Sequence, residues 1–513
     1  MKPIRLVSGF LTVGAWTMLS RVFGFARDIL IAAKLGDGPV AEAFVVAFAL
    51  PNMFRRFFAE GAFNMAFVPM FSKKVEGDHD PLGFARDAFS GLAALLIAFT
   101  LVALAAMPWL VLALASGFAG DERFDLATEF GRIAFPYILF ISLAALLSGV
   151  LNATGRFAAA AAAPVLLNVI LCAAMVGADA LGADIGRALA WAVPLAGIAQ
   201  LALLWHAAAR AGFRLVPHVP RLTPELRQLA RIAAPAMLAG GVMQVNLIVG
   251  KQVASYFDGA IQYLNLADRL YQLPLGVVAI AIGVVLLPDL SRRLEAGDTE
   301  GGRDAFNRAT EFALLLTVPA ALALIVVAHP IVSVLFGRGA FDAEAVAKTA
   351  QVTAIYGAGL PAFVLQKVLQ PLYFARADTV TPFRYALVGM VVNAALAIGL
   401  APLIGFTAAA WATTLAGWAM VALLWWGSRD MGAAVQPDAR LRRRIGRIAL
   451  ASLAMAGVLV ALDAALGAAL YAPALRYAAL AALVGTGILA YFAAAQLLGA
   501  ASVREIRGAM RRG

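Results

Sequence analysis

Long apolar stretches alternate with short polar ones along almost the whole chain. About 20 consecutive apolar residues cross a bilayer as a helix, and stretches of this length recur from end to end. We therefore expect an all-α polytopic membrane protein with about 14 transmembrane helices. The expected spans are residues 8–34, 41–70, 86–114, 128–151, 158–180, 187–209, 229–256, 261–288, 310–336, 346–374, 382–402, 405–427, 446–468 and 474–499.

Composition supports this prediction and excludes other classes. Of the 513 residues, 62% are hydrophobic and 14% are charged, whereas soluble domains are about half apolar and a quarter charged. The single cysteine, Cys172, excludes an intramolecular disulfide framework. Four scattered histidines give no metal-ligand spacing, and the sequence contains no P-loop for ATP and no nucleophile–base set. We expect no metal, no cofactor and no enzymatic activity.

The net charge of +11 reflects membrane topology rather than nucleic-acid binding. The termini and the even-numbered loops between spans hold most of the lysines and arginines, including Arg442–Arg444. The odd-numbered loops hold few cations, namely Lys34, Arg123, Arg187, Arg338 and Arg476. Because cytoplasmic loops are rich in Lys and Arg, both termini are predicted to lie in the cytoplasm.

Two pairs of similar segments indicate an internal repeat at an offset of about 220 residues. The pairs are "FVPMFSKK" (67–74) with "LLPDLSRR" (286–293), and "NATGRFAAAAAAP" (152–164) with "YFARADTVTP" (373–382). Each repeat would hold six helices, and because six is even the two units would share one orientation in the membrane, as parallel repeats do. We therefore predict two six-helix lobes around a central cavity. The predicted parts are an N-terminal lobe (1–215), a C-terminal lobe (216–436), and two extra helices with a basic cytoplasmic tail (437–513).

Several polar and charged residues lie inside the first, second and eighth expected spans. They are Arg21, Arg27, Asp28, Asn52, Arg55, Arg56, Glu60, Asp268 and Arg269. A charge at the bilayer centre costs about 2.5–3.5 kcal/mol on insertion scales, so these side chains should face a polar interior. Pairing of opposite charges explains part of the set, since Arg56 and Glu60 are four residues apart and lie on one face of the same expected helix. Five arginines against three acids still leave a surplus of two positive charges, which favours an anion-binding cavity.

Three segments carry a specific resemblance to a known family: "SRVFGFARD", "AFVVAFALPNMFRRFFAEGAFNMAFVP" and "ADRLYQLPLGVVAIAIGVVLLP". They resemble the MurJ (MviN) family of lipid II flippases, within the multidrug/oligosaccharidyl-lipid/polysaccharide exporter superfamily. The resemblance implies two lobes in a V and a cargo, lipid II (undecaprenyl-pyrophosphoryl disaccharide-pentapeptide), moved from the cytoplasmic to the periplasmic leaflet. It also implies that the last two helices form a groove for the lipid tail. Residues that match the family's charged positions are Arg21, Arg27, Arg55, Arg56, Glu60 and Arg269.

The resemblance further implies a place in the bacterial inner membrane, a role in peptidoglycan biosynthesis and cell shape, and contacts with membrane lipids. Other cell-wall synthesis proteins are further candidate partners. The chain departs from some relatives in the seventh span. Those relatives carry an acidic residue that helps to hold a sodium ion, whereas this chain has Gly250 and Lys251 there, which puts sodium coupling through that site in doubt. The alternative function is an ion-coupled multidrug or polysaccharide-lipid exporter of the same superfamily, although the arginine surplus opposes a cavity for organic cations.

Overall fold

The structure is a computed structural model, and it describes residues 6–56, 62–77, 80–281, 292–293 and 296–501. All regular elements in this part of the chain are helices, as the hydrophobic pattern predicts. The chain divides into two compact units, Met1–Gln262 and Tyr263–Gly513. We call them unit 1 and unit 2. The division into lobes at 215 and 436 follows the repeat and stays a prediction.

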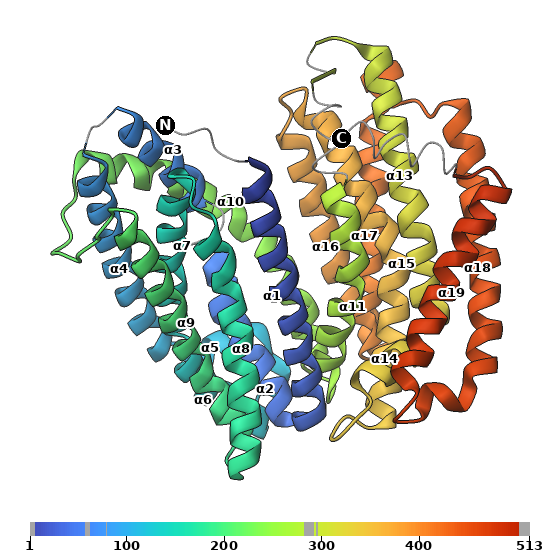
Figure 1. Cartoon of the computed structure of the whole chain (residues 1–513), viewed down its shortest axis with the longest axis horizontal. Coiled ribbons are helices and arrows are strands. Elements are labelled where there is room, and N and C mark those ends of the chain that lie inside the picture. Colours follow the sequence, from blue (N-terminus) through green and yellow to red (C-terminus); the bar gives the residue numbers. More distant parts are fainter. Residues whose placement is uncertain (1–5, 57–61, 78–79, 282–291, 294–295, 502–513) are drawn as a thin grey trace. The chain divides into compact units, whose positions relative to one another are not determined.

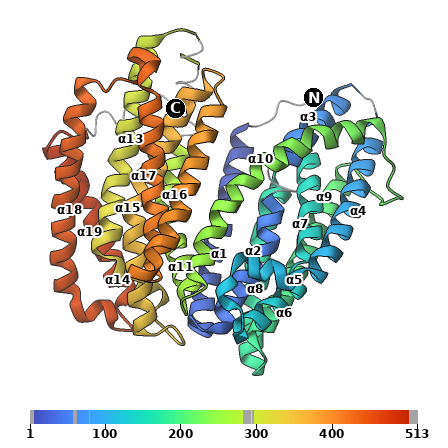
Figure 2. The ribbon, with the colours of Figure 1, turned by 180° about the vertical axis from the view of Figure 1, so that it is seen from behind.

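Unit 1 contains ten α-helices and one short 3₁₀ helix among its described residues (Figure 1). Within it, α1 packs along α8, α2 along α6, and α7 along α9, while α10 crosses close to α3 (Figure 2). The helices are α1 (Leu6–Leu35), α2 (Pro39–Arg55), α3 (Ala62–Glu76), α4 (Pro81–Ala105), α5 (Met107–Leu114), η2 (Ser116–Phe118), α6 (Glu122–Ala134), α7 (Tyr137–Ala153), α8 (Ala158–Leu181), α9 (Ile185–Arg210) and α10 (Pro224–Ala254).

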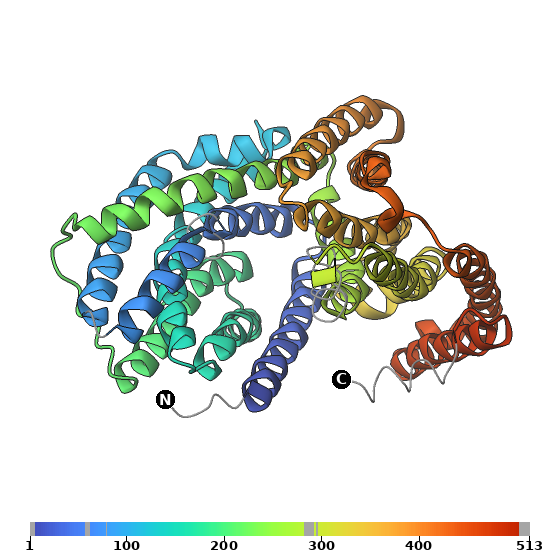
Figure 3. The ribbon, with the colours of Figure 1, turned by 90° about the horizontal axis from the view of Figure 1, so that it is seen from above.

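Unit 2 begins inside α11, whose first residues belong to unit 1. In this unit α13 packs against α15 and α18, and α18 and α19 pack side by side (Figure 3). The helices are α11 (Ala260–Ala281), α13 (Thr299–Val326), α14 (Ala328–Phe336), α15 (Ala343–Phe374), α16 (Val380–Ile404), α17 (Thr407–Gly427), η4 (Arg429–Val435), α18 (Ala439–Tyr471) and α19 (Arg476–Leu497).

Several helices start at a side chain that caps the free N–H groups of the first turn. Three expected spans instead contain a break, because proline lacks the N–H that would continue the helix. Pro108 lies just after the α4–α5 break, Pro136 precedes α7, and Pro330 follows the α13–α14 break. Arg132 Nε reaches the Leu104 carbonyl, which Pro108 leaves without its helical donor, at 3.4 Å. The capping residues are Asp80, Asp121, Asp184, Thr223, Asp298, Asp342 and Asp438.

Ten helical segments in the described residues are long and apolar enough to cross a membrane. Every expected span coincides with one of the described helices or with two consecutive ones, except that residues 57–61 of the second span and 282–288 of the eighth lie outside the described residues. The outer helices expose many large apolar side chains, as a surface in contact with lipid requires. A polytopic membrane protein follows from these features.

Candidate functional site

The charged stretch of the first span is held in place by a buried network in unit 1. The Arg27 side chain is 7% exposed and Asp28 is 3% exposed. Arg27 donates from Nε and Nη2 to Asp28 Oδ1 at 3.0 and 2.7 Å. Its Nη1 donates to Asn168 Oδ1 on α8 at 2.9 Å, and the guanidinium carbon lies 5.9 Å from the centre of the Phe48 ring. Asp28 therefore balances the charge of Arg27, and Asn168 fixes its orientation.

Asn168 is a residue that the sequence argument did not select. Its Nδ2 also donates to the Ser20 carbonyl of α1 at 3.0 Å, so one amide joins the backbone of α1 to the side chain of Arg27. A methyl group on Gly24 would lie 3.4 Å from Asn168 Nδ2, which shows how closely α1 approaches α8 at this point. The only sequence signal is a single polar residue in the apolar stretch "PVLLNVILC".

The other predicted site residues of unit 1 have different surroundings. Arg21 is exposed, and no acidic side chain in the described residues pairs with it. Asn52 is half-buried and donates to the Phe48 carbonyl at 2.9 Å. Arg55 is half-buried, and the exposed Arg56 follows the last residue of α2. Glu60 lies outside the described residues, so the predicted Arg56–Glu60 pair stays a prediction.

The two predicted site residues of unit 2 lie on α11 and are both half-buried. The Asp268 carboxylate accepts a hydrogen bond from Gln272 one turn further along. Beside them, the Tyr271 ring lies 5.2 Å from that of Tyr356 and 5.7 Å from that of Phe363, measured between ring centres. Asp268, three residues before Tyr271 on the same face of α11, therefore lies beside a group of aromatic rings within unit 2. The convergence of Asp268 and Arg269 with the arginines of unit 1 on one ligand stays a prediction.

A second buried ion cluster in unit 1 was also missed by sequence reasoning. The Glu42 side chain, at the start of α2, is 1% exposed. It accepts hydrogen bonds from Arg123 Nη1 and from the Ile261 backbone N–H, both at 3.0 Å. Arg123 also pairs with Asp258 at 3.1 Å. Glu42 therefore holds the first turn of α11, which carries Asp268 and Arg269 further along.

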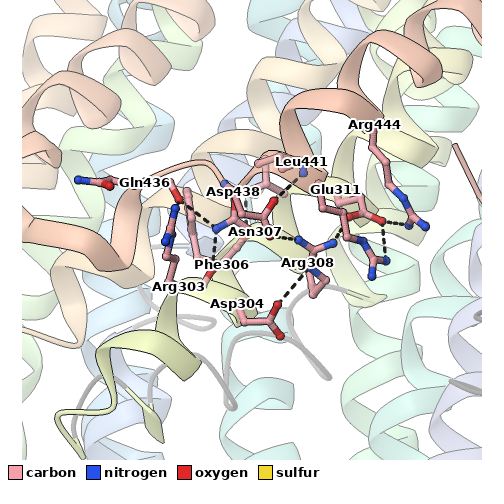
Figure 4. Close-up of polar contacts among 12 residues, drawn as sticks. Arg303, Asp304, Phe306, Asn307, Arg308, Glu311, Gln436, Asp438, Leu441 and Arg444 are labelled. Carbon is pink, nitrogen blue, oxygen red and sulfur yellow. Dashed lines mark hydrogen bonds and ion pairs between the residues drawn. The ribbon is translucent and has the colours of Figure 1, made fainter.

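A third cluster, in unit 2, joins α13 to the start of α18, where the sequence predicted the linker to the extra helices (Figure 4). Glu311 is 6% exposed and accepts from Arg308, Arg440 and Arg444. Arg308 also pairs with Asp438. The Asn307 amide adds bonds to the Gln436 carbonyl and the Asp438 N–H, at 3.1 and 3.0 Å. We call these seven residues the Glu311 cluster.

Two further predictions concern metals and Lys251. In the described part of the chain, no group of three His, Cys, Asp or Glu side chains is placed to hold a metal ion. Lys251 is half-buried in the last turn of α10.

Comparisons with known proteins agree with the resemblance that the charged spans carry. The family model described as "Lipid II flippase MurJ" matches residues 31–479. A protein of Rhizobium meliloti (strain 1021) named "Probable lipid II flippase MurJ" is 44% identical over 528 aligned positions, covering 99% of this chain and 97% of the relative.

Two solved structures share the fold. A structure titled "Lipid II flippase MurJ, inward closed conformation" aligns with a TM-score of 0.79 at 24% identity, covering 95% of this chain and 98% of that one. An inward-facing multidrug transporter of the MATE family and MOP superfamily aligns with a TM-score of 0.68 at 14% identity, covering 83% and 98%. These two structures show the fold alone, whereas the sequence match is specific, and the chain belongs to the MurJ family of lipid II flippases.

Proposed function

We propose that this protein flips lipid II from the cytoplasmic to the periplasmic leaflet of the inner membrane during peptidoglycan biosynthesis. It acts as a transporter and not as an enzyme. The observation that carries the proposal is the 44% identity, over 99% of the chain, to a protein named as a probable lipid II flippase. Both termini then lie in the cytoplasm, as the excess of arginine in the even-numbered loops favours.

The proposed headgroup site is cationic and binds the pyrophosphate of the cargo. Arg27 supports this role because a guanidinium has five N–H donors and the network with Asp28 and Asn168 occupies three of them. Two donors remain, in an orientation that the network fixes. Arg21 supports it because its charge lacks an acidic partner in the described residues. Arg55, Arg56 and Arg269 supply further positive charge, and Asp28, Asn52, Glu60 and Asp268 shape and partly balance it.

Binding at such a site drives transport only through different affinities in the two states of the protein. Arginines from both halves of the chain would repel one another when they approach without a ligand. A bound pyrophosphate, with about two negative charges, removes that repulsion and lets the loaded protein change state. Asp28 and Asp268 limit the positive charge of the empty site, so the cargo is still released. Energy coupling through a sodium site in the seventh span is disfavoured by Lys251.

The extra helix pair is proposed to carry the undecaprenyl tail. Its two helices expose large apolar side chains along their lengths, and the position of a Cβ on Gly457 meets open space. Such a surface suits a long hydrocarbon chain next to the bilayer. The exposed apolar residues include Leu450, Leu453, Val458, Val460, Val484, Ile488 and Leu489.

The test is flipping of labelled lipid II by the full chain in proteoliposomes, with and without a membrane potential. Wild type should flip lipid II, and Arg21→Gln should reduce the rate by at least about tenfold, because the loss of one charge-assisted contact is worth about 1.5–3 kcal/mol. Arg21 is exposed, so the variant should fold normally. The control is Arg187→Gln, which removes an arginine that already pairs with Glu129 at 2.8 Å. Export of organic cations without any flipping of lipid II would overturn the proposal in favour of a multidrug exporter.

A further inference from the structure

Five cations lie in the odd-numbered loops, and two of them lack the acidic partners that the others have. Lys34 pairs with Asp179 at 2.5 Å, Arg123 with Glu42 at 3.0 Å, and Arg187 with Glu129 at 2.8 Å. Neither Arg338 nor Arg476 forms an ion pair with an acidic side chain among the residues that the structure describes. The lack of acidic partners matters because lysine and arginine are scarce in loops on the non-cytoplasmic side of membrane proteins, where the odd-numbered loops are expected.

The two unbalanced arginines lie together, although they are 138 positions apart in the sequence. Both face Tyr477, with guanidinium carbons 5.7 Å (Arg338) and 5.1 Å (Arg476) from the centre of its ring. Arg338 Nη1 donates to the tyrosine hydroxyl at 2.8 Å and Arg476 Nη2 at 3.4 Å. Arg476 Nη1 also reaches the carbonyl of Gly337, the neighbour of Arg338, at 3.4 Å. One tyrosine therefore holds two like charges side by side.

The two arginines lie at opposite kinds of helix end. The position of Arg338 favours a positive charge, whereas the position of Arg476 does not. Arg338 Nη2 donates to the carbonyls of Val334 and Leu335, at 2.9 and 2.5 Å, which is a favourable place for a cation at the C-terminus of α14. Arg476 is instead the first residue of α19, where the helix dipole repels a cation. This first turn has neither an acidic residue nor a side-chain cap. The Nε atoms of both arginines are buried without a hydrogen-bond acceptor.

We propose that Arg338, Arg476 and Tyr477 form a binding site for the phosphate group of a lipid headgroup. Two neighbouring guanidinium groups, one of them at the positive end of α19, match the charge and geometry of phosphate. Tyr471, Leu475 and Tyr477 are each about half exposed, and exposed tyrosines are typical of the depth at which lipid headgroups lie. The lipid is either the pyrophosphate-linked cargo, which rests on the proposed function, or a glycerophospholipid, which does not.

The experiment measures ligand binding at the Arg338–Arg476 site separately from binding at the proposed cargo site. Since Cys172 is the only cysteine, the full chain with Cys172→Ala and Leu475→Cys carries one fluorophore beside Arg476. Undecaprenyl pyrophosphate and phosphatidylglycerol are titrated separately in detergent, with phosphatidylcholine as a zwitterionic control. We expect a saturable fluorescence change with one of the two anionic lipids. Arg338→Gln with Arg476→Gln should weaken its affinity by at least about tenfold, whereas double lysine variants should retain part of it.

Two controls separate this site from the proposed cargo site. A fluorophore at Leu497→Cys, the most exposed large apolar residue of α19, should give a lipid response that the arginine variants do not change. Arg21→Gln should weaken binding of lipid II without changing the response at Leu475→Cys. A response to undecaprenyl pyrophosphate identifies the cargo as the ligand, and a response to phosphatidylglycerol identifies a membrane lipid. An unchanged affinity in the double glutamine variant would overturn the site while leaving the proposed function intact.

Discussion

The helix pair α18–α19 packs against α13 and α14 of unit 2, and arginines contribute to these contacts at the start of each of the two helices. At the start of α18, the arginines of the Glu311 cluster surround the buried carboxylate of Glu311 and the side chain of Asp438 (Figure 4). At the start of α19, Arg338 and Arg476 surround a tyrosine. In the first arrangement, acidic side chains of the protein pair with the arginines. In the second, no acidic side chain among the described residues pairs with either arginine, so the same residue type has a structural role at one end and, we propose, a ligand-binding role at the other.

Arg27 in unit 1 has an intermediate arrangement. One carboxylate balances it, and a neutral amide from another helix fixes its orientation, while some of its donors remain available. The comparison shows that burial of an arginine does not by itself reveal its role. What matters is whether acidic side chains use all of its charge and donors. Four predictions test this view, from the largest expected effect to the smallest.

The largest effect is expected where the protein supplies the anion. Glu311→Ala leaves Arg308, Arg440 and Arg444 without their shared carboxylate, and breaking a buried pair costs about 3–5 kcal/mol. We expect the free energy of unfolding, measured on the purified protein by titration with a denaturing detergent, to fall by that amount. The control is Glu344→Ala, because Glu344 is exposed and pairs with Lys348, one turn along α15, a type of contact worth less than about 1 kcal/mol. Equal losses for the two variants would contradict a structural role for the cluster.

The second largest effect is expected at Asn168, which orients Arg27, the arginine with the intermediate arrangement. Asn168→Ala removes hydrogen bonds to Arg27 and to the Ser20 carbonyl, at a cost of about 1–3 kcal/mol in stability. We also expect slower flipping of lipid II, because Arg27 loses its fixed orientation. Gln200→Ala is the matched control, since Gln200 is another buried amide of unit 1 that bonds the Ala163 carbonyl and Tyr137. If both variants lose stability and transport in the same proportion, Asn168 has no positioning role.

The general fold could be predicted from the sequence, but the partners of individual charges could not. Span positions follow from runs of apolar residues, which are local features. Prolines such as Pro136 and Pro330 show where a span can break, although the sequence does not say which prolines a helix tolerates, since α9 continues through Pro194. Arg27 and Asp28 could be selected because charge is rare in such runs.

Partners distant in sequence depend on tertiary packing. Asn168 is 141 positions from Arg27, and Glu311 is 133 positions from Arg444. Neither pairing follows any helical period. Arg338 and Arg476 lie outside the first, second and eighth spans, in which the arginine surplus was counted. Both are at helix ends, where a cation usually faces water, so the sequence pattern does not single them out. Only the missing acidic partners, seen in three dimensions, distinguish them from ordinary loop residues.

The third effect is expected to be small. Arg338→Gln with Arg476→Gln should change the stability of the lipid-free protein by less than about 1 kcal/mol, because the lost contacts with Tyr477 are offset by the loss of repulsion between two like charges. The measurement is thermal unfolding in a neutral detergent. Adding the lipid that binds should stabilise the wild type more than the variant. A loss of several kcal/mol without lipid would assign these arginines a structural role like that of the Glu311 cluster.

The smallest effect concerns the pH dependence of the two attachments. Burial acts to raise the pKa of Asp438, but the Leu441 N–H and the Arg308 guanidinium outweigh it and hold this pKa below its ordinary value of 3.8. A lowered pKa in the folded state means that the charge stabilises the protein above the unfolded-state pKa, and that this contribution is lost as pH falls through the folded-state pKa. Asp438→Asn keeps a side chain able to cap α18 and removes only the charge.

We therefore expect Asp438→Asn to lower stability at neutral pH by a few tenths to about 1 kcal/mol, because Asp438 is partly exposed. The difference from wild type should begin to shrink below about pH 4, where the carboxylate of the unfolded protein takes up its proton, and it should vanish only below the lowered pKa of the folded protein. Thermal unfolding at pH 7 and pH 3.5 measures both values. The double glutamine variant at Arg338 and Arg476 should differ from wild type equally at the two pH values when lipid is absent, since no acidic side chain in the described part of the chain pairs with them. A pH-dependent difference in that variant would reveal an acidic partner, and the contrast between the two attachments would then disappear.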